Sequence, residues 1–195
     1  MIPTESIDAL LYRLMHNYAM IPPAPGRLLL AHPDVEDPHF ERTVVYLLAH
    51  NEEGSLGVVI NRANPSAFPS FDSPLMPWFD VVSPPQMIFD GGPVQLEAIL
   101  CLHPDPELAA GVRSVDVTWD DPEAFAGRIR IFQGYSGWSA HQLESEIMAG
   151  GWFVVAAEPT DVLDPEPENL WRAVFARQED DLRKLSGYPD DPNYN

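Results

Sequence analysis

The sequence predicts an α+β fold in which a mixed, mostly antiparallel sheet is flanked by helices. Apolar runs of strand length follow one another through most of the chain and are separated by turn residues rather than by helices. Helical periodicity is confined to the two ends and to one internal segment. The chain has 195 residues, of which 45% are hydrophobic, and this suffices for one domain with a substantial core.

Composition narrows the classes of function. With 11 Lys and Arg against 30 Asp and Glu, the formal net charge is −19, which argues against direct binding of nucleic acid because phosphate contacts require clustered cations. The single cysteine, Cys101, excludes an internal disulfide framework. No basic leader and no apolar run of about 18 residues occurs, so we expect a cytoplasmic protein without a membrane span.

Residues 1–25 are predicted to form an N-terminal helix and a proline-rich connector. Apolar residues recur at helical spacing between residues 7 and 18, and a cluster of three prolines then ends the helix. Its polar face carries one cation, Arg13, so packing against the domain or against another chain is favoured over a membrane surface.

A β-hairpin opens the domain proper, which we place at residues 26–186. Residues 27–31, 43–49 and 56–60 are apolar or β-branched runs of strand length. The last two are separated by Asn51-Glu-Glu-Gly-Ser55, a cluster typical of a turn. The sequence therefore predicts that these two runs pair as a hairpin.

Residues 63–86 interrupt this rhythm with six prolines, and we expect only one irregular helical turn there, at residues 75–79. Beyond this segment the pattern of short apolar runs resumes. Strands are predicted at residues 87–89, 97–102, 112–119 and 128–132.

The clearest helix start lies at Ser139. Ser139 and Gln142 are three residues apart, which is the spacing of a capping box, and Trp138 and Leu143 have the spacing of a hydrophobic staple. The glycine pair at 150–151 is expected to end this helix, because glycine adopts the left-handed conformation without strain.

The last part of the chain reads as a strand, a helix and a tail. Residues 152–157 are predicted to form a strand, and Asp164-Pro165 to begin a long helix, since proline at the first helical position removes no needed donor. Residues 187–195 are expected to be a flexible tail. The buried stripe of the helix is predicted to consist of Trp171, Phe175, Leu182 and Leu185.

Four motifs stand in the order that marks a known bacterial family. They are Gly26-Arg-Leu-Leu-Leu-Ala31 with Asp37-Pro-His-Phe-Glu-Arg-Thr-Val-Val45; His50 with Gly54-Ser-Leu-Gly-Val-Val-Ile-Asn-Arg62; Phe89-Asp-Gly-Gly-Pro-Val94; and Phe132-Gln-Gly-Tyr-Ser-Gly-Trp138 with Gln142-Leu-Glu144. Over residues 26–157 the chain therefore resembles the YqgE/AlgH family, whose members are often described as transcriptional regulators.

The resemblance implies a bifurcated sheet that curls into a pseudo-barrel, in a cytoplasmic bacterial protein for which no catalytic residues are established. The chain departs from the family pattern in two places. Ala63 and Asn64 precede Pro65, where the family pattern has proline directly after Arg62. The helix usual before Gly-Gly-Pro is replaced by the proline-rich segment 63–86, so no partner site in that segment is implied.

Polar residues beside the buried strands are the candidates for contact with a ligand or a partner, because such groups need hydrogen-bond partners or a ligand. The alternative is a structural hydrogen-bond network. A Gly-Gly-Pro turn could also expose backbone N–H groups to an anion, although no P-loop Lys or Ser/Thr follows it. The candidates are Arg42, Asn61, Arg62, Gly91, Gly92, Tyr135, Ser136 and Trp138.

We predict no catalytic residue, metal or cofactor. Gly134-Tyr-Ser-Gly137 departs from the nucleophile elbow G-x-S-x-G, because Trp138 stands where the second glycine belongs, and a tight strand-to-helix turn is the alternative interpretation. One group of histidines and carboxylates lacks the spacing of metal motifs and reads as a solvated turn. The group consists of His32, Asp34, Glu36, Asp37, His39 and His50.

Two functions follow as hypotheses. The first is a non-enzymatic regulatory or binding module that contacts a protein or a small molecule. The second is a hydrolase of a small ligand, such as a nucleotide or an ester, that acts around residues 134–138. The sequence identifies no nucleophile–base pair, which favours the first. The helix predicted after Ser139 carries no Lys or Arg, so DNA recognition through it is disfavoured.

Overall fold

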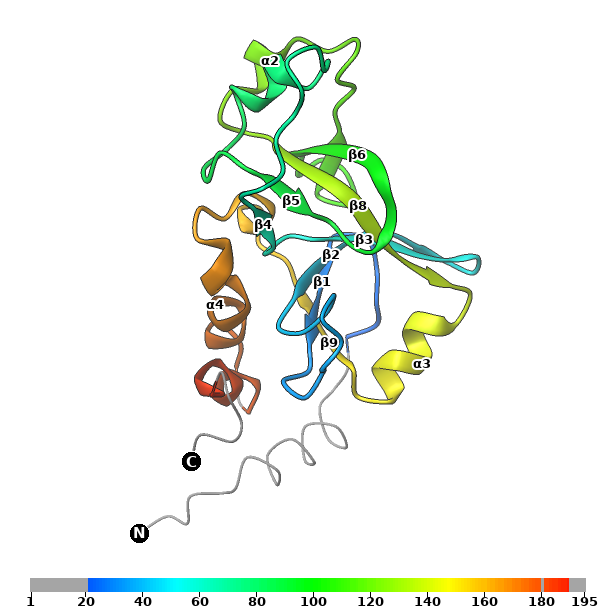
Figure 1. Cartoon of the computed structure of the whole chain (residues 1–195). Coiled ribbons are helices and arrows are strands. Elements are labelled where there is room, and N and C mark those ends of the chain that lie inside the picture. The colour runs from blue at the N-terminus through cyan, green and yellow to red at the C-terminus, as the bar shows by residue number, and fades with distance from the viewer. Residues whose placement is uncertain (1–20, 180, 190–195) are drawn as a thin grey trace.

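The structure is a computed structural model that describes residues 21–179 and 181–189 (Figure 1). The helix predicted between residues 7 and 18 lies outside the described residues. The strands are β1 (Arg27–Ala31), β2 (Val44–Asn51), β3 (Gly54–Val59), β4 (Ala63–Asn64), β5 (Ile88–Asp90), β6 (Val94–Pro104), β7 (Val112–Ser114), β8 (Arg130–Ser139) and β9 (Trp152–Ala156). The helices are α2 (Met76–Phe79), α3 (Gln142–Met148) and α4 (Leu170–Ala176), with 3₁₀ turns η1 (Pro122–Phe125), η2 (Asp161–Leu163), η3 (Pro167–Asn169) and η4 (Leu182–Gly187).

The sheet branches at β8 (Figure 1). The first half of β8 pairs with β5 in parallel and with β6 in antiparallel orientation, and its second half pairs with β3. The main path runs β4-β5-β8-β3-β2-β1-β9, and β6 carries β7 as a branch. The prediction of a mixed, mostly antiparallel α+β fold is confirmed. The sheet is not closed into a barrel, because β4 and β9 stand at the two ends of this path.

The predicted hairpin is confirmed as β2–β3, with a tighter loop than expected. Asn51 pairs with Gly54, so the loop proper consists of two residues, and the Asn51 Oδ1 accepts the Glu53 N–H at 2.8 Å. Gly54 has φ 142°, and a Cβ there would lie 2.2 Å from the Trp138 carbonyl oxygen. Glycine is therefore required where the hairpin meets β8.

The strand predicted at residues 128–132 is present as the start of β8, but the tight turn expected after it is wrong, because β8 continues without a break through residues 130–139. Gly134, with φ 68°, lets the backbone at Gly92 approach, since a Cβ on Gly134 would lie 2.5 Å from the Gly92 carbonyl oxygen. Gly134 thus permits a close approach of two segments of the chain within a strand. It does not reverse the chain.

The predicted strand 112–119 is also shorter than expected. β7 ends at Ser114, and the following residues turn because the Asp116 Oδ1 accepts the Thr118 N–H at 2.8 Å and the Asp120 Oδ2 accepts the Asp116 N–H at 3.0 Å. Aspartates compete for backbone donors in this way and end strands. In addition, β6 begins earlier than predicted, and β4 was not predicted at all.

Both faces of the central sheet are buried. Leu28 and Leu30 of β1 belong to a core that the C-terminal elements α4 and η4 cover, whereas Leu29 and Ala31 belong to a second core against α3. Successive residues of a strand point to opposite faces, so a fully apolar strand requires cover on both sides. A third core, with Trp78 of α2 and Phe125 of η1, lies beneath the part of the sheet formed by β5, β6 and β8.

Helix α3 begins at Gln142, later than the sequence predicts. The Gln142 Oε1 accepts the Ser139 N–H at 3.0 Å, which is one half of the predicted capping box. The N-cap is instead His141, with φ 61°, because β8 extends to Ser139. Trp138 and Leu143 lie in the same apolar cluster, as a staple requires.

The long helix predicted after Asp164-Pro165 is interrupted. Only residues 170–176 form an α-helix, and the 3₁₀ turns η3 and η4 flank it. The Gln178 N–H bonds to the Phe175 carbonyl and tightens the last turn, and the acidic residues that follow are unfavourable at a helix C-terminus. The predicted buried stripe is nevertheless confirmed: Trp171, Phe175, Leu182 and Leu185 are 0–2% exposed.

Packing continues past residue 187, where the sequence predicts the tail to begin. Tyr188 is buried and its hydroxyl donates to the Asp34 Oδ1 at 2.8 Å. Among the described residues, no helix has the length and apolar character that crossing a membrane requires.

Candidate functional site

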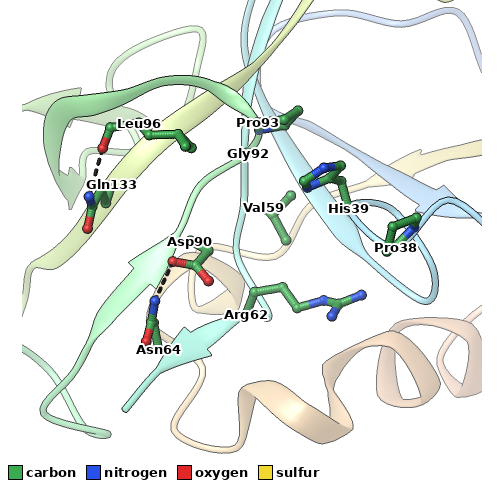
Figure 2. Close-up of a pocket in the computed structure, with 10 residues that line it drawn as sticks. All are labelled: Pro38, His39, Val59, Arg62, Asn64, Asp90, Gly92, Pro93, Leu96 and Gln133. Atoms are coloured by element: carbon green, nitrogen blue, oxygen red, sulfur yellow. Dashed lines mark hydrogen bonds between the residues drawn. The ribbon is translucent and has the colours of Figure 1, made fainter. Parts of the chain in front are cut away.

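The branch point of the sheet carries a pocket of about 370 Å³ (Figure 2). The turn at residues 37–40 and the end of β3 form one wall, and β4, β5, β8 and the start of β6 form the other. All four sequence motifs contribute to the pocket, although they are far apart along the chain. It is lined by Pro38, His39, Val59, Arg62, Asn64, Asp90, Gly92, Pro93, Leu96 and Gln133.

Arg62 supplies the cation of this pocket. It follows β3, and its side chain runs toward Pro38 and His39 (Figure 2). The Arg62 Nη2 donates to the Glu41 carbonyl oxygen at 2.5 Å, which holds the guanidinium against the turn at 37–40. Within the described part of the chain, no carboxylate pairs with this guanidinium. Its other N–H donors are therefore available to an anion.

Asp90 of β5 supplies the anion, and it is the cross-strand neighbour of Arg62. The Asn64 Oδ1 accepts the backbone N–H groups of Ser66 and Ala67 at 2.9 and 3.2 Å, which fixes the orientation of the Asn64 amide. Its Nδ2 then donates to the Asp90 Oδ1 at 2.8 Å (Figure 2). The Asp90 N–H donates to the Arg62 carbonyl at 2.8 Å, so the backbones of the two charged residues are directly linked.

Gln133 of β8 completes the polar lining. Its Nε2 donates to the Leu96 carbonyl oxygen at 2.7 Å, which ties the arched start of β6 to β8 (Figure 2). The Leu96 side chain is 59% exposed at the pocket edge. The wall therefore combines an apolar rim with an amide oxygen that can accept a hydrogen bond.

Gly91 and Gly92 place Asp90 at the pocket. The Gly91 N–H donates to the Gln133 carbonyl at 2.8 Å, and the Gly91 carbonyl accepts the Val59 N–H at 2.8 Å. This N–H is consumed by the sheet, so it does not contribute to an anion nest. Gly92 has φ 146°, and a Cβ there would lie 2.4 Å from both the Ser136 Oγ and the Tyr135 carbonyl oxygen.

Arg42 and Asn61 lie outside this pocket and join backbone segments. The Asn61 Oδ1 accepts the Val44 N–H and its Nδ2 donates to the Arg42 carbonyl, both at 2.9 Å. The Arg42 guanidinium lies 5.0 Å from the ring centroid of Trp171, and its Nη2 donates to the Pro189 carbonyl. The two residues thus connect the turn before β2 to β3 and to the C-terminal segment.

Tyr135, Ser136 and Trp138 lie along β8, and none of them lines this pocket. Ser136 is 0% exposed and its hydroxyl donates to the Gly91 carbonyl at 3.2 Å. The Trp138 Nε1 donates to the Glu146 Oε2 at 2.8 Å, beneath α3. Tyr135 packs partly buried against the core on the other face. These contacts connect β8 to its neighbours.

A serine–histidine pair exists elsewhere, on the β2–β3 hairpin. The His50 Nδ1 lies 2.8 Å from the Ser55 Oγ, and the His50 Nε2 lies 3.6 Å from a Glu144 carboxylate oxygen. His50 and Ser55 face each other across the two strands, and Ser55 is 8% exposed. The pair holds the hairpin to α3. The sequence does not show it, because five residues and a chain reversal separate the two side chains.

The remaining histidines and carboxylates of the 32–50 region do not converge. His32 is buried and stacks on Phe153 with 5.5 Å between ring centroids, whereas His39 is exposed at the pocket. Asp37 accepts the His39 N–H at 2.8 Å, as a turn residue does. Within the described residues, no group of three or more His, Cys, Asp or Glu side chains could hold a metal ion.

We expect the stability of the protein to fall below about pH 6.5 through His32. Burial lowers the pKa of His32, and the Asp34 carboxylate opposes this effect only in part. Below that pH the unfolded chain binds a proton at His32 and the folded chain does not. The contribution of His32 to the free energy of unfolding is therefore fully present above the unfolded pKa and is lost as the pH falls. In thermal unfolding between about pH 7.5 and about pH 5, His32→Phe should therefore lose less stability than the wild type.

The matched control for this experiment is His39→Phe, because His39 is exposed. It should reproduce the pH dependence of the wild type. An unchanged pH dependence in His32→Phe would show that burial of His32 does not carry the effect.

Comparison with known proteins shows the family of the chain. The sequence profile of the AlgH-like family matches residues 28–183. The chain belongs to the AlgH-like family. This confirms the resemblance read from the four motifs. A UPF0301 protein of Streptomyces coelicolor is 45% identical over 186 residues, which cover 87% of this chain and 94% of that protein. A UPF0301 protein of Mycobacterium avium is 41% identical over 184 residues, covering 87% and 90%.

Two solved structures resemble this AlgH-like chain. A crystal structure of a Corynebacterium diphtheriae protein gives a TM-score of 0.78 at 30% identity and covers 90% of this chain and 98% of that chain. The solution structure of AlgH from Pseudomonas aeruginosa gives a TM-score of 0.61 at 30% identity and covers 88% and 100%. All residues of the pocket lie within the span that the family profile matches.

The pocket contains Arg62 and Gly92 from the sequence candidates, and Gly91 directly supports it. Sequence reasoning did not single out Asp90, Asn64 or Gln133. Asp90 and Gln133 stand inside two of the motifs, which was the available signal. Asn64 stands where the chain departs from the family pattern, so only the structure reveals its contact with Asp90.

Proposed function

We propose that this AlgH-like chain is a non-catalytic binding module of the cytoplasm, and that its branch-point pocket takes a small zwitterion of amino-acid or dipeptide size. The observation that carries the proposal is the convergence of four separate motifs on one pocket, which a cation and an anion line from neighbouring strands. Polar groups that converge in a concave site are the usual sign of a ligand site.

Charge complementarity supports this class of ligand. The Arg62 guanidinium can bind a carboxylate through its unpaired N–H donors, and the Asp90 carboxylate retains lone pairs for an ammonium group after accepting from Asn64. A volume of about 370 Å³ lies at the small end of ligand pockets, which suits one or two amino-acid residues. A ligand with only one charge would leave either Arg62 or Asp90 without a charged partner.

The contacts of Ser136 support a binding role over the hydrolase hypothesis. A serine nucleophile needs a base within about 3.2 Å and access to its substrate. The Ser136 hydroxyl is fully buried and donates to a backbone carbonyl. A regulatory role would then act through a ligand-dependent contact. Direct DNA binding is disfavoured, because α3 carries Glu144 and Glu146 and no Lys or Arg.

Thermal unfolding with the amino acids and with dipeptides such as Gly-Gly tests this proposal. A ligand at 100 times its Kd adds about 2.7 kcal/mol, and each kcal/mol raises the Tm by roughly 2–4 °C. The wild type should show a shift of that order with at least one zwitterion. Arg62→Gln should abolish the shift, because glutamine keeps a donor toward Glu41 but loses the charge.

The matched control is Arg183→Gln, which removes an exposed arginine far along the chain from every pocket motif. It should retain the shift of the wild type. A wild type that responds to no zwitterion, or an Arg62→Gln protein that responds like the wild type, would refute the proposed site.

A further inference from the structure

We propose a second ligand site in this protein, for a phosphorylated and hydroxyl-bearing metabolite of nucleoside-phosphate size. The site is a pocket of about 660 Å³ beside the β6–β7 hairpin, with its remaining walls formed by η1 and by residues 159–163. It shares no residue with the branch-point pocket. The inference therefore does not depend on the function proposed above.

Three basic side chains line this pocket, and two of them pack against one aromatic ring. His103 of β6 and Arg113 of β7 are directly opposite each other in the ladder. The Arg113 Cζ lies 5.0 Å from the ring centroid of Phe125, and the His103 ring lies 5.2 Å from it. Phe125 is 8% exposed, so it is a fixed platform against which the Arg113 guanidinium and the His103 ring pack.

Arg128 is the third member of this group. The Arg128 Nη2 donates to the Ala124 carbonyl at 2.8 Å, which holds the guanidinium at the end of η1. Its backbone carbonyl lies 2.8 Å from the His103 Nδ1. Because a carbonyl only accepts, the His103 Nδ1 carries the proton, and the Nε2 is left for a ligand.

Neither arginine has a carboxylate partner in the part of the chain that the structure describes. In a protein with 30 acidic and 11 basic residues, each cation has many potential partners. Two unpaired guanidinium groups offer planar, forked donors that match phosphate oxygens. Two of the few cations thus lie exposed at one pocket without a carboxylate partner among the described residues.

The other side chains of the pocket indicate what accompanies the phosphate. Asp105 and Glu107, on the loop after β6, bring two carboxylates, and Thr160 brings a hydroxyl. The Asp105 Oδ1 accepts the Glu107 N–H at 3.1 Å, which anchors the first carboxylate. Carboxylates repel phosphate but bind hydroxyl groups well. A volume of about 660 Å³ holds more than a free phosphate ion, so we assign the carboxylates to the hydroxyls of a sugar.

Calorimetric titration with ADP, inorganic pyrophosphate and adenosine tests the assignment on the full chain. We expect ADP to bind, pyrophosphate to bind more weakly and adenosine to show no heat. Each of Arg113→Gln and Arg128→Gln should weaken ADP binding about tenfold, because each removes a charge-assisted contact. Asp105→Asn should weaken binding of ADP but not of pyrophosphate, since asparagine keeps the Oδ1 acceptor and loses only the charge.

The control is Arg62→Gln, the same substitution in the branch-point pocket, which should bind ADP like the wild type. Unchanged melting temperatures of the variants would exclude loss of folding as the cause. No ADP binding by the wild type, or unchanged binding by the double variant Arg113→Gln/Arg128→Gln, would overturn the site. Equal affinity for pyrophosphate and ADP would overturn the role of the carboxylates. If Arg62→Gln is the only variant that no longer binds ADP, the proposed phosphate site is wrong, and ADP binds through Arg62 in the branch-point pocket.

Discussion

Replacement of Asp161 by alanine is expected to lower the free energy of unfolding by about 3–5 kcal/mol. Asp161 is 2% exposed, and its two carboxylate oxygens accept Nη1 and Nη2 of Arg177 at 2.6 Å each. Its Oδ2 also accepts the Glu158 N–H at 2.7 Å. This bidentate pair joins the turn η2 to the end of α4, so it holds the C-terminal cover on the sheet.

The environment of Arg177 explains why the loss is large. Burial by itself lowers the pKa of Arg177, but the hydrogen bonds and the charge of Asp161 outweigh burial and raise the pKa overall. Without Asp161, the guanidinium keeps the exposed Glu158 carboxylate at 3.4 Å and the charge of Asp164, with no bidentate partner. The free-energy cost of removing the Arg177 guanidinium from water would then no longer be offset by a bidentate ion pair.

Urea unfolding measures this effect, and Lys184→Ala is its matched control. Lys184 also pairs with an aspartate, Asp181, at 2.7 Å, but its side chain is 55% exposed. Exposed pairs contribute less than about 1 kcal/mol, so this variant should unfold close to the wild type. A loss at Asp161→Ala no larger than that at Lys184→Ala would contradict the structural role of the buried pair.

Gly92→Ala is expected to destabilise the protein by about 2–6 kcal/mol and to deform the branch-point pocket. The residue has φ 146°, which an L side chain rarely adopts, and such strain costs about 1–3 kcal/mol. The new Cβ would also lie 2.4 Å from the Tyr135 carbonyl oxygen, which is backbone and cannot rotate away. Overpacking of this kind adds about 1–3 kcal/mol.

Gly137→Ala is the control on the neighbouring part of β8. A Cβ at Gly137 would meet nothing closer than the Tyr135 ring at 3.4 Å, which is ordinary contact, and the residue is exposed. Urea unfolding should therefore show a change of less than about 1 kcal/mol there. Equal stability of the two variants would show that the β5–β6 connection can move away from β8, and the tight crossing would then not define the pocket.

Local sequence patterns correctly predicted those elements whose structure depends mainly on their own residues. The β2–β3 hairpin followed from two apolar runs around a turn cluster, and the buried stripe from Trp171 to Leu185 followed from its spacing. The turn predicted at Gly134 is wrong, because glycine permits both a turn and the close approach of another segment of the chain. Only the neighbouring strand, which lies some 40 positions earlier in the sequence, shows which of the two applies.

The sequence by itself determined the α+β class, the acidic character and the family, because composition, periodicity and motif order are properties of the chain alone. It also placed Arg62 and Gly92 among the candidates. Only the tertiary structure decided that Arg62 lies beside Asp90, that Asn61 and Ser136 bond to backbone, and that Arg113 and Arg128 share a second pocket. A site forms where strands from distant positions in the sequence lie side by side. Pairing across the sheet brings these strands together, and the spacing of residues along the chain does not encode that pairing.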